Sequence, residues 1–117
     1  MSTDDTGIAT VTDIATTWQI LHAALTQRRA VRARYHGRTR VLCPHALGWK
    51  HGRAKTLVYQ TAVVDGPQHD DRRGWRSLFI DEIEDAIVTD DPWRTAPNYT
   101  PHSNGIDILA AAITSHS

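Results

Sequence analysis

The sequence contains a single cysteine, Cys43, among its 117 residues. One cysteine cannot form a disulfide within the chain, so a disulfide-stapled scaffold is excluded and a reducing compartment, the cytoplasm, is the expected location. No stretch approaches 18 consecutive apolar residues, and residues 1–8 lack the apolar segment of a signal peptide. The sequence therefore predicts a protein that neither spans a membrane nor is secreted.

Acidic residues are missing from one long stretch of the chain. None lies between Asp13 and Asp65, whereas nine of the 13 basic residues do. The zero net charge at pH 7 is thus a cancellation between a basic first half and an acidic second half. Such an asymmetry is typical of a surface that meets a polyanion. The alternative is that the two halves pair with each other within the fold, and we place the anion-binding interpretation first.

The length allows one domain with one modest core. Residues 1–11 are small and polar, and we expect them to be disordered. Residues 12–93 form the predicted domain, a helix followed by a β-barrel, and residues 94–117 form an irregular tail that contains a short helix.

Two helices are predicted from apolar spacing. The first is capped by Thr12 or Asp13 and ends near Arg28, and its buried face repeats at steps of four, three and four: Ile14, Trp18, Leu21 and Leu25. The second, in the tail, is brief. Asn104 is its expected cap, and its apolar stripe is Ile106, Leu109 and Ile113.

From Ala30 onward the apolar period becomes two, which predicts strands. Pro44 is expected to end the second strand, and a short extended piece follows at residues 47–50. Further strands are predicted at Lys55–Val64, Trp75–Ile80 and Ile83–Val88. The fold class is therefore mainly β with flanking helices: a five-stranded SH3-like or Sm-like barrel preceded by one α-helix, with a short C-terminal helix. A plain antiparallel sheet under one helix is the second choice.

The loop of the first hairpin is predicted from strand pairing. A two-residue loop, His36-Gly37, would place Tyr35 opposite Arg38 and mix apolar with charged side chains. A three-residue loop places Tyr35 opposite Thr39 and leaves one apolar face, so we predict that register. It also sets Arg34 opposite Arg40 on the outer side, a repulsion that a bound anion would relieve.

Several short pieces of the chain, taken in their order and spacing, resemble the WYL-domain family, and in particular its small stand-alone bacterial members. The resemblance covers residues 21–93. The pieces are Leu21-His22-Ala23-Ala24-Leu25, Arg28, Val31, Tyr35-His36-Gly37-Arg38-Thr39-Arg40-Val41, Pro44-His45, Leu47-Gly48, Leu57-Val58-Tyr59-Gln60 and Gly74-Trp75-Arg76-Ser77-Leu78-Phe79-Ile80-Asp81-Glu82-Ile83.

The resemblance implies an Sm-like or SH3-like barrel and a regulatory role, in which a basic groove binds nucleic acid or a nucleotide-like ligand. Arg40 and Arg76 match arginines that line the groove in the family. The Trp-Tyr-Leu triplet that names the family corresponds to Lys55-Thr56-Leu57 here.

Residue chemistry extends this candidate site. Arginine suits phosphate because its guanidinium is planar, always charged and able to donate two hydrogen bonds at once. Tyr59 or Trp75 offers a stacking face, and Gln60 offers an amide to read a base edge or a ribose hydroxyl. The candidate ligand-binding residues are Arg32, Arg34, Arg40, His45, Tyr59, Gln60, Trp75 and Arg76. The structural alternatives are a core role for the two aromatic residues, an ion pair of Arg76 with Asp81 or Glu84, and a structural hydrogen bond for His45.

Catalytic and metal chemistry have weaker support. The spacing of Cys43, His45 and His51 does not match a zinc site, and Cys43 is expected to be a core thiol. We therefore expect no enzyme activity, metal or cofactor. The first hypothesis is a non-catalytic module that binds single-stranded nucleic acid or a nucleotide. The second is a homodimeric protein-interaction module, and the third is a small metal-dependent nuclease that uses His45 with the acidic residues 81–85.

Overall fold

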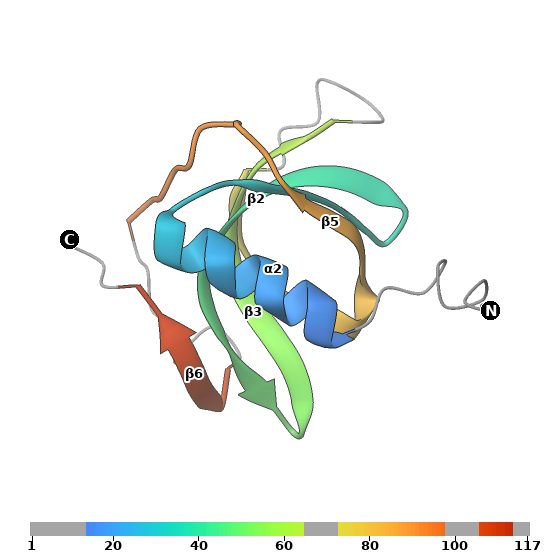
Figure 1. Cartoon of the computed structure of the whole chain (residues 1–117), viewed down its shortest axis with the longest axis vertical. Coiled ribbons are helices and arrows are strands. Elements are labelled where there is room, and N and C mark those ends of the chain that lie inside the picture. Colours follow the sequence, from blue (N-terminus) through green and yellow to red (C-terminus); the bar gives the residue numbers. More distant parts are fainter. Residues whose placement is uncertain (1–13, 65–72, 98–105, 114–117) are drawn as a thin grey trace, which may run out of the picture.

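The computed structural model describes residues 14–64, 73–97 and 106–113 (Figure 1). This part of the chain is mainly β with one N-terminal α-helix, as predicted, and its strands form one antiparallel sheet. The elements are α2 (Ile14–Gln27), β1 (Val31–Tyr35), β2 (Arg38–Lys50), β3 (Arg53–Val63), β4 (Gly74–Phe79), the 3-10 helix η1 (Ile80–Glu82), β5 (Ile83–Val88) and β6 (Ile108–Ala112).

The sheet has the strand order β4-β3-β2-β1-β5, and β6 also pairs with β2. β2 is long enough to pair with two strands in succession, β1 through Arg38–Leu42 and β6 through Ala46–Trp49. The end strands β4 and β5 are joined by the three residues of η1 alone, so the sheet must curl to bring them together (Figure 1). No β4–β5 pair occurs among the described strands, so closure into a barrel is not shown.

The main core lies between α2 and the concave, inner face of the sheet, which α2 crosses in Figure 1. Leu21 and Leu25 of the helix belong to the same buried cluster as Leu42, Val58 and Leu78 of the sheet. The predicted helix and its end near Arg28 are confirmed, whereas the two predicted capping residues lie outside the described ranges. Ile14 departs from the predicted buried face, because its exposed fraction is 45%.

The first hairpin has the register that the sequence analysis rejected. Tyr35 pairs with Arg38, so the loop contains only His36 and Gly37, with φ of +51° and +79°. Positive φ at both loop residues is typical of the type I′ turn, whose twist matches that of the flanking strands. Arg34 therefore lies opposite Thr39, and the expected repulsion between Arg34 and Arg40 is absent from this pairing.

The register prediction failed because it assumed that β2 has one apolar face. Val41 and Leu42 are neighbours in the chain, yet both are buried, Leu42 in the main core and Val41 in a second cluster. The second cluster exists because the chain after β5 covers the outer face of the sheet, where Trp93 packs near Cys43. A strand buried on both faces loses the alternation on which the prediction relied.

Pro44 was expected to end the second strand, and this prediction is wrong. β2 continues through it, and the pairing with β3 shifts register between Pro44 and Ala46. Pro44 also lies between the part of β2 that pairs with β1 and the part that pairs with β6. A proline is tolerated at a bulge of this kind because its missing N–H interrupts little of the hydrogen-bond ladder.

The predicted C-terminal helix is wrong, because its residues form β6. Leu109, Ala111 and Ile113 are half-buried at a period of two, while Ile108 is exposed. The three alanines hid this period in the sequence. Gly48 of β2 allows the close approach of β6, since a Cβ at this position would collide with the Ile108 carbonyl group. The expected cap Asn104 lies outside the described residues.

Residues 89–97, which we call the outer strap, cross the outer face of the sheet. The Cys43 sulfur accepts a hydrogen bond from the Arg94 N–H at 3.2 Å, and the Trp75 indole donates to the Pro97 carbonyl oxygen at 2.9 Å. These contacts join the strap to β2 and β4, so the second cluster is covered although the strap has no regular structure. Cys43 is fully buried there, and its burial raises the pKa of the thiol.

Candidate anion-binding site

The structure distributes the eight candidate residues over three places. One group lies on the inner face of the sheet, one lies under the outer strap, and one lies on the outer face of β1. The groups are, in that order, Arg40, Gln60 and Arg76; His45, Tyr59 and Trp75; and Arg32 and Arg34.

The inner-face triad, Arg40, Gln60 and Arg76, comes from three adjacent strands. Gln60 is two residues from the core residue Val58, and Arg76 is paired with Val58 across the strands. Arg40 is paired with Ala33, another core residue. Because alternate residues of a strand share a face, the pairing places all three side chains on the inner side of the sheet.

Arg40 is held in position by two hydrogen bonds. Its Nε donates to the Tyr35 carbonyl oxygen and its Nη1 to Oε1 of Gln60, both at 3.1 Å. The guanidinium also lies 5.6 Å from the centre of the Tyr35 ring, within range of a cation–π contact. Gln60 itself is fully buried, so this geometry is fixed from below by the interior of the protein.

Arg76 approaches the same place from β4. Its Nη1 donates to the Trp75 carbonyl oxygen at 3.0 Å. A Cβ added at Gly74 would lie 2.9 Å from that nitrogen, so the guanidinium lies over Gly74, which is the strand partner of Gln60. One half-buried guanidinium, that of Arg40, is thus bonded to the buried amide, and a second, that of Arg76, lies over the strand partner of that glutamine. Asp81, one of the two acids that the sequence alternative offered to Arg76, pairs with Arg53 at 2.7 Å.

His45 lies in the protein interior, under the outer strap. Nδ1 is 2.7 Å from the Cys43 carbonyl oxygen and therefore donates to it, whereas Nε2 accepts a hydrogen bond from the Thr95 hydroxyl at 2.8 Å. The ring stacks on Trp93 with centroids 4.5 Å apart. Burial lowers the pKa of His45 to about 4, and this outweighs the bond to Cys43, which favours the protonated form. This geometry favours the structural hydrogen bond that had been the alternative for His45.

Tyr59 and Trp75 also form part of the packing under the strap. Their rings meet edge to face with centroids 5.3 Å apart, and the rings of Trp75 and His45 are nearly perpendicular with centroids 4.7 Å apart. Both side chains are half-buried. This arrangement favours the core interpretation over a stacking platform for bases.

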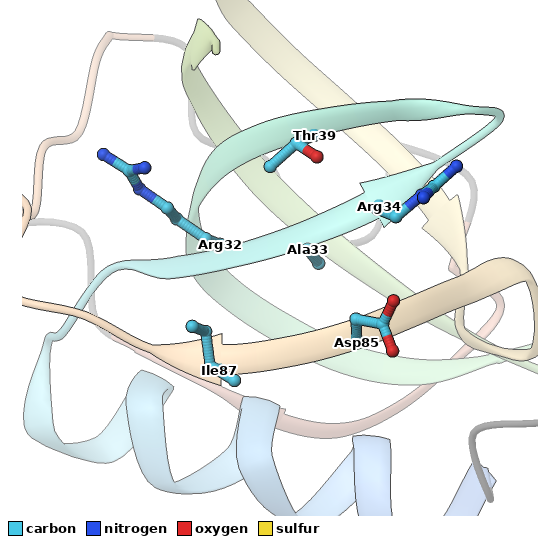
Figure 2. A pocket seen from close by; sticks show the side chains of 6 residues that line it. All are labelled: Arg32, Ala33, Arg34, Thr39, Asp85 and Ile87. Carbon is cyan, nitrogen blue, oxygen red and sulfur yellow. The ribbon is translucent and has the colours of Figure 1, made fainter. Parts of the chain in front are cut away.

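Arg32 and Arg34 lie on either side of a shallow hollow of about 260 Å³ on the outer face (Figure 2). Figure 2 shows the two side chains pointing away from each other along β1, with Asp85 and Ile87 on the neighbouring strand β5 and Thr39 on β2. Arg32 donates two hydrogen bonds to Asp91, at 2.9 and 3.3 Å, and this lowers the pKa of that carboxyl group. Arg34 lies 4.0 Å from Glu84. Acids of the second half of the chain thus accompany both arginines.

The charge asymmetry of the sequence largely resolves within the fold. β1 pairs with β5, which brings the basic and the acidic halves side by side. Further ion pairs join Arg29 to Asp90, Lys50 to Asp107 and Arg53 to both Asp81 and Glu82. Pairing of the basic and acidic halves within the fold, which was the alternative interpretation, therefore accounts for many of these charges. Charges that are paired within one chain also offer less attraction to a second copy, so a dimer held by opposite charges loses support.

Two residues of the inner-face site were not identified from the sequence. Tyr35 was assigned to the core, and it does lie there, but its carbonyl oxygen also orients Arg40, and its hydroxyl accepts a hydrogen bond from the Phe79 N–H at 3.3 Å. Gly74 has a φ of +146° and gives Arg76 its space. A glycine opposite a buried glutamine was the available signal for this role.

Within residues 14–64, 73–97 and 106–113, no three His, Cys, Asp or Glu side chains converge as metal ligands would. No helix in the same part of the chain is long and apolar enough to cross a membrane. Comparison of the chain with models of protein families, with curated proteins and with solved structures finds no match.

Proposed function

We propose that the chain is a non-catalytic, WYL-like regulatory module whose inner-face triad binds the phosphate of a nucleotide, either free or as one unit of a single-stranded nucleic acid. In this proposal the curled sheet is a barrel of the SH3-like or Sm-like kind, and the protein acts in the cytoplasm. The observation that carries the proposal is that Arg40, Gln60 and Arg76 share the inner face of three adjacent strands, with Arg40 bonded to Gln60 and Arg76 over Gly74, the strand partner of Gln60.

The chemistry of the triad fits a phosphate better than a carboxylate or a neutral ligand. Two guanidinium groups provide two positive charges and planar pairs of N–H donors, which match the several oxygens of a phosphate. Arg40 is already oriented by Tyr35 and Gln60, so little side-chain entropy is lost when it binds. The amide of Gln60 is fully buried and acts through Arg40, whose guanidinium it holds in position.

The arginines of β1 are secondary in this proposal. Arg32 and Arg34 lie on the outer face, and their acidic neighbours offset much of their charge. We therefore assign them at most a contribution to the approach of a long nucleic acid, through the field of the surface.

The test is calorimetric titration of the pure protein with a nucleoside triphosphate and with a 12-nucleotide single strand, each at low and moderate salt. Arg40→Lys and Arg76→Lys retain the charge and lose the planar fork, and each should weaken binding at least tenfold. Arg29→Ala removes one positive charge at a half-exposed ion pair outside the triad and serves as the control, with little expected effect.

Binding that is strong for the single strand and falls steeply with salt identifies the nucleic acid as the ligand. Binding of the triphosphate alone identifies a free nucleotide. The proposal fails if neither ligand binds, or if Arg40→Lys and Arg76→Lys bind as well as the wild type. Shortened strands after incubation with Mg²⁺ would contradict its non-catalytic part.

A further inference from the structure

We propose that β6 is an interface strand, which pairs antiparallel with β6 of a second copy of this chain about a two-fold axis. β6 pairs with β2 along one edge, and Figure 1 shows it at the periphery of the molecule. It lies along the half of β2 that β1 does not reach, on the edge opposite β3. A second copy added here would extend the sheet through β2 and β6 of both chains.

The composition of β6 favours such pairing. Monomeric proteins protect exposed sheet edges with charged residues or proline. β5, at one end of the strand order, carries Glu84 and Asp85. The segment from Ile108 to Ile113 has no charged residue, proline or glycine. In addition, Ile108 has an exposed fraction of 62%, the highest of the large apolar residues in the described part of the chain.

The backbone of β6 gives the position of the proposed axis. Pairing with β2 shifts register between Leu47 and Gly48, and it skips Ala110. This register leaves Ala110, the central residue of β6, without a paired residue on β2. An axis at this residue places Ala110 opposite Ala110 of the second copy, and Ile108 opposite Ala112, so that each large side chain meets a small one.

The charges around the strand favour the antiparallel arrangement. Asp107 precedes β6 and its side chain is about half exposed. A parallel pair would place the two Asp107 residues side by side, whereas the antiparallel pair separates them by about 20 Å, at 3.4 Å for each residue. No like charges then meet along the strand. Association should accordingly be insensitive to salt, unlike a dimer held by basic and acidic surfaces.

The interface is small, and this sets the expected behaviour. Stable interfaces bury roughly 1,200–2,000 Å² in total, and one edge strand of five residues per copy lies near or below the lower limit. We therefore expect a reversible dimer whose population rises with concentration. In sedimentation equilibrium the average mass should rise from 13.1 kDa toward twice that value.

The decisive experiment introduces charge at the proposed axis. Ala110 is exposed, so Ala110→Lys and Ala110→Glu should leave the monomer folded, which circular dichroism checks. Each variant alone should remain monomeric, because two like charges would lie opposite each other. An equimolar mixture of the two variants should form a mixed dimer at low salt. Ala15→Lys, at an exposed position of α2, is the matched control and should dimerise like the wild type.

Ala112→Lys provides a second variant if the first disturbs the fold. A wild-type protein that stays at 13.1 kDa up to millimolar concentration overturns the proposal. So does a dimer that persists unchanged in Ala110→Lys and Ala112→Lys. Since neither variant touches the inner-face triad, the ligand titration and this experiment can fail independently.

Discussion

At the scale of the residue, burial decides what a side chain does. His45 has the chemistry of an acid, a base or a ligand contact, yet both of its ring nitrogens are bonded within the protein and Trp93 covers the ring. Gln60 is equally buried, but its oxygen is turned toward Arg40. The same degree of burial therefore leaves one residue structural and makes the other the base of the proposed binding site.

His45 leads to a prediction for the pH dependence of stability. Its pKa is about 4 in the folded protein and near 6.5 in the unfolded chain, so the unfolded state binds more protons between these values. The free energy of unfolding should be highest above pH 6.5 and fall by about 3 kcal/mol as the pH drops to 4. Urea denaturation from pH 7.5 to 4 measures this slope.

His45→Gln is the control for that slope. The variant lacks the titrating ring, so its stability should change less over the same interval, whatever its value at pH 7. The lowered pKa values of Glu82 and Asp91 act below pH 4.5, outside most of the window. An equal slope in the wild type and the variant would show that His45 is not held neutral by burial.

At the scale of the element, glycines decide where the chain turns and where strands approach. Both hairpins use a His-Gly pair with positive φ, His36-Gly37 and His51-Gly52, because a two-residue turn of this type matches the twist of the strands. Gly48 has a different role, since it provides space for the backbone of β6. The first role can be recognised from sequence, whereas the second depends on a neighbour 60 residues away.

Two alanine substitutions should separate these roles. At Gly52 nothing lies within 4 Å of an added Cβ, so Gly52→Ala acts through its φ of +80° and should cost about 1 kcal/mol. Gly48→Ala forces β6 away from β2 and should cost about 3 kcal/mol, as in overpacked cores. Chemical denaturation gives both values.

Hydrogen exchange at residues 108–112 distinguishes the two variants further. Gly48→Ala should remove the protection of these amides, and Gly52→Ala should leave it unchanged. Retained protection in Gly48→Ala would mean that β2 and β6 do not meet as closely as described here.

At the scale of the whole molecule, the fold brings oppositely charged halves together. The pairing of β1 with β5 and the position of the outer strap place Arg32 beside Asp91 and Arg29 beside Asp90. The first pair is a two-bond contact in which Thr89 also donates to Asp91, whereas the carboxylate of Asp90 is fully exposed. Exposed pairs contribute little because water and salt screen them.

These two neighbouring acids allow a matched comparison. Asp91→Asn should lower the urea midpoint at pH 7, because it removes the charge that Arg32 and Thr89 satisfy, whereas Asp90→Asn should barely change it. The wild type should also lose the contribution of Asp91 as the pH falls below about 3.8, since its pKa is lowered in the folded state. Equal midpoints for the two variants would contradict a structural role for the Arg32–Asp91 pair.

Local patterns in the sequence determined α2, β3, β4 and β5, because each has a clear apolar period and ends near a turn or charged residues. The family resemblance suggested Arg40 and Arg76 as candidates, and side-chain chemistry added Gln60. Only the tertiary structure decided the register of the first hairpin, the path of β2 through Pro44 and the strand at residues 108–112. The physical reason is that each depends on a segment distant in the chain. The outer strap buries the second face of β2, and β2 supplies the partner that makes a strand of an alanine-rich segment. The same distant contacts turned Arg32 and Arg34 toward acids and left the inner-face triad as the proposed site.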